Sequence, residues 1–171
     1  MTGTAVRPDT DFSHLRKASV EIAALARELA PATEQARQLA PALVERLRDS
    51  GLMRCGAPES LGAAQAPPGV SLECAETIAR GDASAGWCVS IALTSSLLAG
   101  YLPSDGAAEI LGGSRAVAAG VWAPRGTARP VDGGVRVSGR WAFCSGITHA
   151  DFLFGGCTLT SYERDCDGNQ T

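Results

Sequence analysis

The residues best suited to chemistry in this sequence lie close together, between positions 120 and 156. This segment carries two tryptophans, a phenylalanine, a serine and a histidine among several glycines: Trp122, Trp141, Phe143, Ser145 and His149. Aromatic rings provide flat apolar walls, whereas a hydroxyl and an imidazole can donate and accept hydrogen bonds. Such a set of side chains suits the binding of a flat ligand that has a polar edge.

Each of these residues also has a purely structural interpretation. Both tryptophans can be packing residues, Ser145 can be a turn residue before Gly146, and His149 can satisfy local backbone groups. Arg125 in the same segment either meets a phosphate or carboxylate or is a solvated loop charge. Trp87, further upstream, is predicted to pack in the core.

The cysteines and histidines do not predict a metal site. Six cysteines are spread over the chain: Cys55, Cys74, Cys88, Cys144, Cys157 and Cys166. No two of them form a C-x-x-C pair, and His14 and His149 are the only histidines. Because zinc sites need ligands clustered at short spacing, we expect no metal and interpret the cysteines as inert packing thiols.

The composition describes one ordinary domain, or one domain and part of another. The 171 residues carry 15 Lys and Arg against 18 Asp and Glu, a net charge of −3. This balance argues against nucleic-acid binding, which requires clustered positive charge.

Because residues 1–12 lack the apolar segment of a signal peptide, we expect a cytoplasmic protein. Residues 83–104 carry no charge, but serines and glycines dilute them, so we predict a helix buried in a bundle and no membrane span.

The hydrophobic pattern predicts an α+β fold, an N-terminal all-α helical bundle followed by an incomplete antiparallel β domain. Helical spacing of apolar residues occurs in four segments before residue 114: 12–29, 41–50, 70–81 and 105–111. Pro31 is expected to interrupt the first pattern. Beyond residue 114 the period changes, and Asp132-Gly133 between two alternating segments indicates a hairpin. We therefore predict a helical domain at 1–114, a partial β domain at 115–159 and a polar tail at 160–171.

Several motifs in the same order resemble the acyl-CoA dehydrogenase superfamily. The matching segments are residues 47–52, 57–62, 79–84, 120–126, 131–134, 137–146 and 149–151. Within that superfamily, the pattern Trp141-x-Phe143-x-Ser145-Gly146-x-x-His149 is more similar to two-component flavin-dependent monooxygenases, because dehydrogenases usually have W-I-T-N there. The loop at 122–127 keeps the family's proline but lacks the Thr-Glu pair and the downstream serine of T-E-P-x-A-G-S. This difference puts the usual acyl-CoA contacts in doubt.

The resemblance implies a flavin cofactor: FAD, or reduced FMN or FAD that a partner reductase supplies. It assigns the flavin contacts to six residues: Trp122, Pro124, Gly126, Trp141, Phe143 and Ser145. His149 is the candidate catalytic residue. The substrate would be a small molecule, either an acyl-CoA that is dehydrogenated or an aromatic compound that is hydroxylated. Members of the family are homo-oligomers.

The resemblance also implies that the chain is incomplete. Members of the family are much longer, and the dehydrogenase base lies on a C-terminal helical domain, so no residue here is assigned as that base. The polar tail at 160–171 lacks the expected continuation of the strand. Two hypotheses remain: an N-terminal fragment of a flavin-dependent oxidoreductase, or a non-catalytic remnant of a truncated gene.

Overall fold

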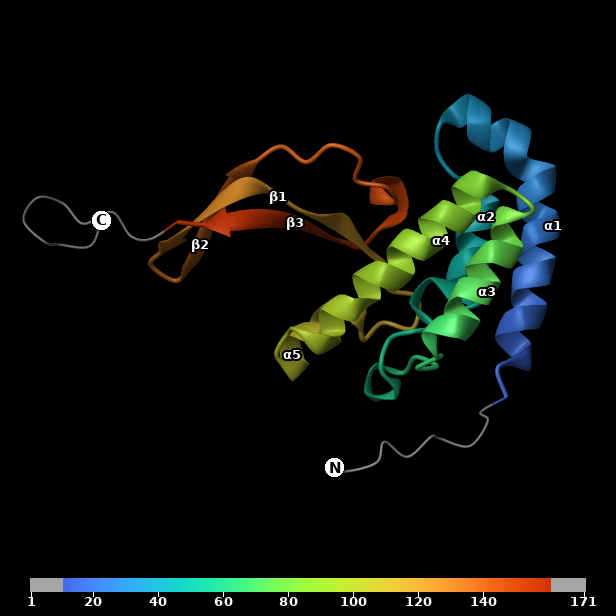
Figure 1. Cartoon of the computed structure of the whole chain (residues 1–171), viewed down its shortest axis with the longest axis horizontal. Helices are drawn as coiled ribbons and strands as arrows, with labels where there is room; N and C mark the ends of the chain where they lie inside the picture. The colour runs from blue at the N-terminus through green and yellow to red at the C-terminus, as the bar shows by residue number, and fades with distance from the viewer. Residues whose placement is uncertain (1–10, 161–171) are drawn as a thin grey trace, which may run out of the picture.

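The computed structural model describes residues 11–160. A helical layer comes first in the chain, and a small sheet follows it and lies beside it (Figure 1). The helices are α1 (Ser13–Ala36), α2 (Pro41–Asp49), α3 (Pro68–Ala79), α4 (Ala83–Ser95) and α5 (Ser104–Leu111). The strands are β1 (Ala118–Val131), β2 (Gly134–Gly139) and β3 (Phe152–Leu159). The α+β class is therefore confirmed. The division into domains at residue 114 stays a prediction, and residues 161–171 of the expected tail lie outside the described residues.

The first helix is longer than the sequence predicts. Pro31 lies inside α1, which continues to Ala36. A proline in a helix removes one backbone hydrogen bond but does not forbid further turns when neighbouring residues pack well. Thr33, beyond the proline, is buried, and its hydroxyl accepts a hydrogen bond from the Ala40 N–H at 3.3 Å. The expected interruption at Pro31 is therefore wrong.

The core lies where α1, α2, α3 and α4 meet. Large aliphatic side chains from three of these helices are fully buried there: Leu15, Ile22, Leu43, Leu47 and Ile78. Full burial of one such side chain stabilises the fold by about 1.5–3 kcal/mol relative to an exposed one. The helical spacing in the sequence thus marks the faces that pack together.

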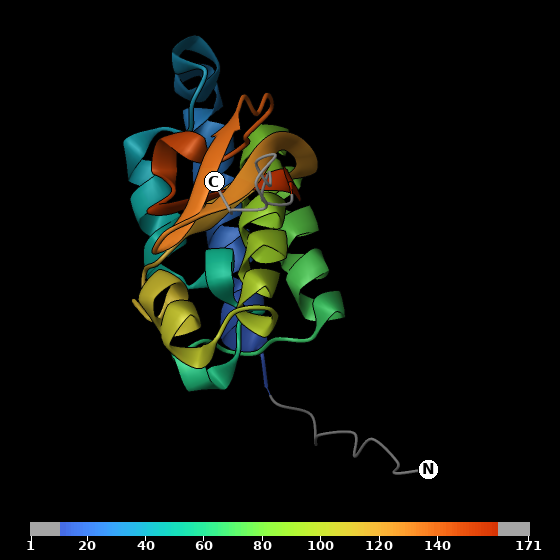
Figure 2. The same cartoon turned by 90° about the vertical axis from the view of Figure 1, so that its left-hand side faces the viewer.

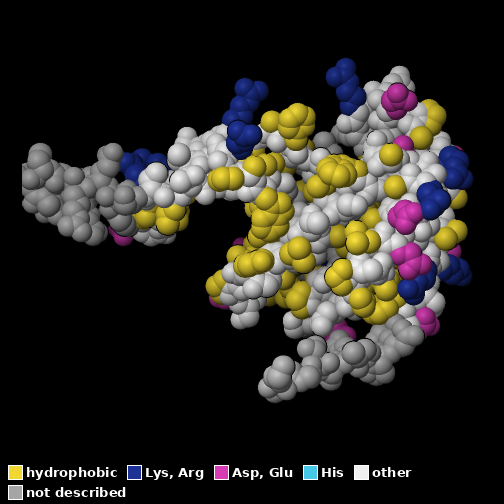
Figure 3. Space-filling model, in the orientation of Figure 1, with side chains coloured by type: hydrophobic (Ala, Val, Ile, Leu, Met, Phe, Trp, Pro, Cys, Tyr) yellow, Lys and Arg dark blue, Asp and Glu magenta, His cyan; other side chains and the backbone are white. Residues whose placement is uncertain are grey.

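The uncharged stretch forms α4 and a 3-10 turn, Ser96–Gly100. Asp82 caps α4, because its carboxylate accepts the Ala85 N–H at 2.8 Å. Residues Ala83–Gly100 are long and apolar enough to cross a membrane by length and composition, and 39% of that stretch is buried in the fold. Figure 3 shows hydrophobic side chains on the visible surface of this region, and Trp87 and Leu97 are both 58% exposed. Only one side of α4 is therefore a core surface.

The sheet has the order β2-β1-β3 and is mixed. Figure 2 shows its strands in front of the helical layer. The predicted hairpin is present, with β1 and β2 antiparallel around the Gly133 turn. The third strand runs parallel to β1, with Ala118 opposite Phe152, so the expectation of purely antiparallel pairing is wrong. The physical reason is the connection through residues 140–151, which brings the chain back to the start of β1 before β3 begins.

Pro124 lies within β1, which is the longest strand of the sheet. The pairing of β1 with β3 shifts between Val121 and Gly126, and the pairing with β2 begins only at Gly126. A proline cannot donate to a sheet, so an irregularity in the pairing is the place where it costs least. The strand therefore continues past the proline without a break.

Trp141 packs against one face of the sheet in a space left by three glycines. A Cβ atom on Gly126, Gly139 or Gly155 would lie within 2.3–2.8 Å of atoms of the indole. The indole N–H donates to the carbonyl oxygen of Gly156 at 2.8 Å. Glycine at these positions therefore lets the tryptophan ring approach the strands.

One guanidinium joins the helical layer to the sheet. Arg48 on α2 donates to both carboxylate oxygens of Asp151, at 2.9 and 3.0 Å, just before β3. It also donates to the carbonyl oxygens of Arg115 and His149, both at 2.8 Å. Asp151 in turn accepts the Val117 N–H at 2.9 Å. Bidentate pairs of this kind fix orientation as well as distance.

Substitution of Gly155 by alanine is expected to destabilise the sheet. The new methyl group would lie 2.6 Å from the Trp141 ring, and overpacking of this kind costs about 1–3 kcal/mol. Gly134→Ala is the matched control, since a methyl group added there would meet no atom within 4 Å and its cost should be below about 0.5 kcal/mol. Urea unfolding of both variants measures the difference. Equal midpoints would contradict the packing of Trp141 on the glycines.

Substitution of Arg48 by methionine keeps the side-chain stem and removes the guanidinium. We expect the free energy of unfolding to fall by about 2–3 kcal/mol, because Asp151 and two carbonyl groups lose their donor. Arg80→Met is the control: its pair with Glu76 is 74% and 66% exposed, and its loss should cost less than about 0.5 kcal/mol. Urea unfolding at neutral pH measures both.

The same variant should change the response to acid. Burial opposes ionisation of Asp151, but hydrogen bonds from Arg48 and Val117 and the charges of Arg48 and Arg115 lower its pKa overall. This contribution to stability is present above the usual aspartate pKa of about 3.9 and is lost as the pH falls through the lower folded value. As the pH falls from about 5 to the value at which Asp151 is fully protonated, Arg48→Met should therefore lose less stability than the wild type. Parallel pH curves would contradict this account.

Candidate functional site

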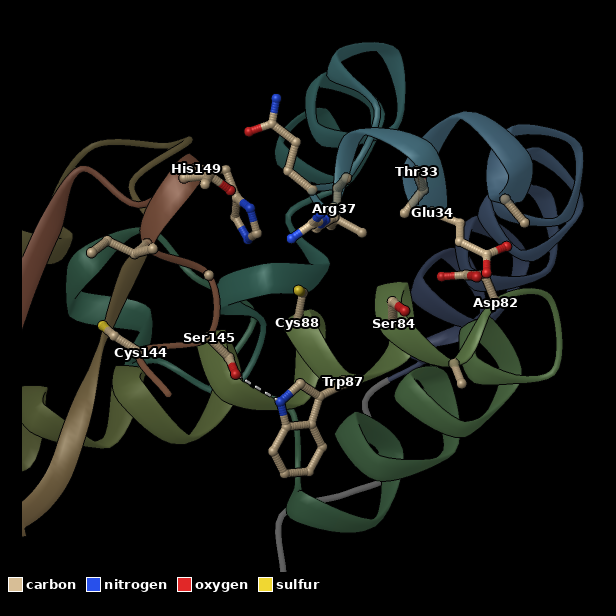
Figure 4. Close-up of a pocket in the computed structure, with 17 residues that line it drawn as sticks. Thr33, Glu34, Arg37, Asp82, Ser84, Trp87, Cys88, Cys144, Ser145 and His149 are labelled. Carbon is tan, nitrogen blue, oxygen red and sulfur yellow. Dashed lines mark hydrogen bonds between the residues drawn. The ribbon is translucent and has the colours of Figure 1, made fainter. Parts of the chain in front are cut away.

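A cavity of about 730 Å³ lies between the helical layer and the segment that leads into β3 (Figure 4). The end of α1 contributes Thr33, Glu34 and Arg37 to its wall, and the start of α4 contributes Trp87 and Cys88. Residues 144–149 close a third side. The cavity thus contains Ser145 and His149, two of the residues that the sequence singles out.

Ser145 is held by a side chain from α4. The indole N–H of Trp87 donates to the Ser145 hydroxyl oxygen at 2.9 Å, as Figure 4 shows. The backbone N–H of Ser145 donates to the carbonyl oxygen of Phe143, also at 2.9 Å. Gly146 follows with φ +87°, a conformation that favours glycine. The turn and the indole together direct the hydroxyl to the cavity wall.

His149 lies in the last position of a 3-10 turn, Ile147–His149, with 8% of its surface exposed. Arg48 holds its backbone carbonyl, but neither ring nitrogen has a hydrogen-bond partner among residues 11–160. Burial, and then the charge of Arg48, lower the pKa of the imidazole. The ring is therefore neutral at neutral pH and has one donor and one acceptor free. A buried polar group without a partner costs about 1–3 kcal/mol, so this ring is suited to a ligand or water contact.

The charges around the cavity are few and mixed. Two carboxylates, Glu34 and Asp82, and one guanidinium, Arg37, are the charged groups of the lining. Burial raises the pKa of the Cys88 thiol to about 11, so this group is an uncharged thiol at neutral pH. Within the described range, 11–160, no group of three or more His, Cys, Asp or Glu side chains could hold a metal ion. The lining suits an uncharged or weakly polar part of a ligand.

A second hollow, of about 510 Å³, lies beside β1. Its lining includes Trp122, Arg125, Arg140 and Phe143. Phe143 is 98% exposed and has a positive φ of 60°, and the Trp122 ring makes an edge contact with Phe154 at a centroid distance of 4.7 Å. Two of the six predicted flavin contacts therefore border this hollow and not the cavity with Ser145.

The two predicted tryptophan walls lie on opposite faces of the sheet. Trp122 contacts Phe154, whereas the Trp141 ring packs against Gly155. Phe154 and Gly155 are successive residues of β3, and successive residues of a strand point to opposite faces. Gly126 lies with Trp141, and Pro124 is exposed in β1. The structure thus distributes the six predicted contacts over four surroundings and does not unite them in one pocket.

The sequence interpretation missed Trp87. We expected a core residue, but the side chain is 58% exposed, borders the cavity and binds Ser145. Its position in an uncharged helix gives no sign of this role, because an apolar stretch predicts burial on every side. The partner lies 58 residues further along the chain, a contact that spacing alone does not reveal.

No family model matches the chain. Indole-3-acetate monooxygenase of Pseudomonas putida is 31% identical over 122 residues, 70% of this chain and 31% of that protein. The oxygenase subunit HsaA of Rhodococcus jostii, a flavin-dependent monooxygenase, is 31% identical over 142 residues, 82% of this chain and 37% of that protein. The chain therefore spans about a third of the length of these relatives.

Solved structures agree with the sequence relatives. The HsaA monooxygenase of Mycobacterium tuberculosis has a TM-score of 0.84 at 28% identity, over 91% of this chain and 43% of that one. XiaF from Streptomyces, solved with FADH2 and glycerol, has a TM-score of 0.79 at 27% identity, over 93% and 39% of the two chains. The chain is thus a homologue of the oxygenase subunits of two-component flavin-dependent monooxygenases and has the acyl-CoA dehydrogenase superfamily fold over the part described.

Proposed function

We propose that this chain is part of a flavin-dependent oxygenase that hydroxylates an aromatic compound with reduced flavin from a partner reductase. The observation that carries the proposal is the buried, unpartnered imidazole of His149 in the same cavity as the Ser145 hydroxyl. The relatives support a flavin-dependent reaction, because they are named as monooxygenases and XiaF was solved with FADH2.

The residues of the cavity fit the polar edge of a flavin. Ser145 and His149 offer hydrogen bonds, and the Trp87 ring offers an apolar wall beside them. When bound, the flavin supplies the redox chemistry with oxygen, while the protein binds and orients it. Phe143 and Trp122 border the neighbouring hollow and remain candidates for contacts with another part of the same molecule.

The relatives favour an aromatic substrate over an acyl-CoA. Two of them are named for indole-3-acetate and for resorcinol, both aromatic compounds. The loop at 122–127 supports the same choice, because it lacks the Thr-Glu pair and the downstream serine of the dehydrogenase pattern.

The remaining expectations belong to the same proposal. A flavin reductase is the partner that a two-component oxygenase requires, and a homo-oligomer in the cytoplasm is the form expected from the family and from the N-terminal sequence. The competing hypothesis, a non-catalytic remnant, predicts a chain that binds no flavin. Flavin binding by the 171-residue chain is therefore the decisive experiment.

Removal of the Ser145 hydroxyl should weaken flavin binding. We expect the dissociation constant for FMN or FAD to rise about 5- to 10-fold in Ser145→Ala, the loss of roughly one hydrogen bond. Ser138→Ala on exposed β2 is the matched control and should bind as the wild type does. Fluorescence titration, with oxidised flavin and with dithionite-reduced flavin under argon, measures the constants. A wild-type chain that binds neither flavin would support the remnant hypothesis.

We expect two effects when His149 is replaced by leucine: weaker flavin binding and a smaller loss of folding stability at low pH. The folded imidazole has a lowered pKa, so the unfolded chain takes up the proton first as the pH falls below about 6.5. Wild-type stability should therefore decline below that pH, and His149→Leu should decline less. His14→Gln, an exposed site on α1, is the control for both measurements. Flavin affinity and a pH slope unchanged in His149→Leu would exclude a role for the ring.

A further inference from the structure

We propose that Trp87 is a positioning residue that fixes the Ser145 hydroxyl as a hydrogen-bond donor to the ligand of the cavity. The inference rests on the proposed flavin function, because it concerns the same site. It adds a residue that the family motif does not contain, since Trp87 lies on α4 and the motif covers residues 141–149.

The contact joins two parts of the chain that have separate supports. α4 is fixed in the helical layer by the Asp82 cap and by buried residues such as Val89. Ser145 belongs to a turn held by short-range backbone bonds, Ser145 N–H to the Phe143 carbonyl and His149 N–H to the Gly146 carbonyl. These local bonds shape the turn but do not place it against α4. The 2.9 Å hydrogen bond from the Trp87 indole places the start of the turn against α4.

The direction of this bond determines what Ser145 can do. An indole N–H can only donate, so it occupies a lone pair of the hydroxyl oxygen. The hydroxyl proton must then point elsewhere, and within residues 11–160 the Ser145 hydroxyl makes no second hydrogen bond. Hydrogen bonds in a chain polarise one another, so a hydroxyl that already accepts one hydrogen bond donates the next one more strongly. The structure thus gives Ser145 one free proton and a fixed position beside the cavity.

The substitution Trp87→Phe separates the positioning of Ser145 from simple packing by the ring. Trp87 borders both the cavity and the groove between α3 and α4, so removal of the whole ring would open the wall between them. Trp87→Phe keeps an aromatic wall and removes the N–H. The side chain is 58% exposed, so the smaller ring should not disturb the core.

A double-mutant cycle on FMN binding tests the proposal. We expect Trp87→Phe to raise the dissociation constant about 3- to 5-fold, somewhat less than Ser145→Ala, because it acts only through the hydroxyl. The double variant should bind no worse than Ser145→Ala alone. Additive losses would show that Trp87 acts independently of Ser145 and would overturn the inference. A Trp87→Phe chain that binds as tightly as the wild type would also overturn it.

A second readout does not depend on flavin. The ¹H–¹⁵N signal of the Trp87 indole, assigned by its absence in Trp87→Phe, should shift and exchange faster with solvent in Ser145→Ala. It should stay in place in Ser145→Thr, which keeps a hydroxyl, and in the control Ser138→Ala. An indole signal unaffected by Ser145→Ala overturns the inference, whereas a wild-type chain that binds no flavin overturns the proposed function and leaves this readout to decide the contact.

Discussion

The pairing of Arg48 with Asp151 is the interaction on which the rest of the arrangement depends. The guanidinium comes from α2, whose other face is part of the core, and its partner is the residue before β3. The same guanidinium binds the carbonyl of His149, so the start of the third strand and the buried imidazole are fixed together. An arginine is suited to this task because its planar fork of donors satisfies several oxygens at once. Without it, the start of β3 and the back of the cavity would lose the largely buried guanidinium that joins them to α2.

Two contacts from the helical layer therefore hold the segment from 145 to 151. Trp87 holds its start through a hydroxyl, and Arg48 holds its end through a carboxylate and a carbonyl. The first contact involves a half-exposed ring and the second a largely buried guanidinium, so they differ in strength. The two contacts act at the two ends of the segment, so Ser145 and His149 both have a defined place in the cavity wall.

The sequence predicts the elements better than their relations. Helical periodicity identifies the faces of Leu15, Ile22 and Leu43, and Asp132-Gly133 identifies the hairpin, because both signals are local. The parallel pairing of β3 is not local, since it depends on how a long connection returns to β1. Motif spacing likewise places Ser145 and His149 close together correctly. It does not show that Trp122 and Trp141 lie on opposite faces of the sheet, because Trp141 follows β2 in a connection whose path the spacing does not determine.

The separation of the predicted residues has a consequence for how one ligand could meet them. The segment 142–145 borders both hollows: Phe143 faces the one beside β1, and Ser145 faces the cavity under α1 and α4. A molecule long enough to reach both would have to cross this short turn, whose backbone has positive φ at Phe143. A non-glycine residue in that conformation is strained unless its surroundings hold it there. The bond from Trp87 to the neighbouring Ser145 is one such restraint, so the geometry of both hollows depends on the same turn and on the helix that anchors it.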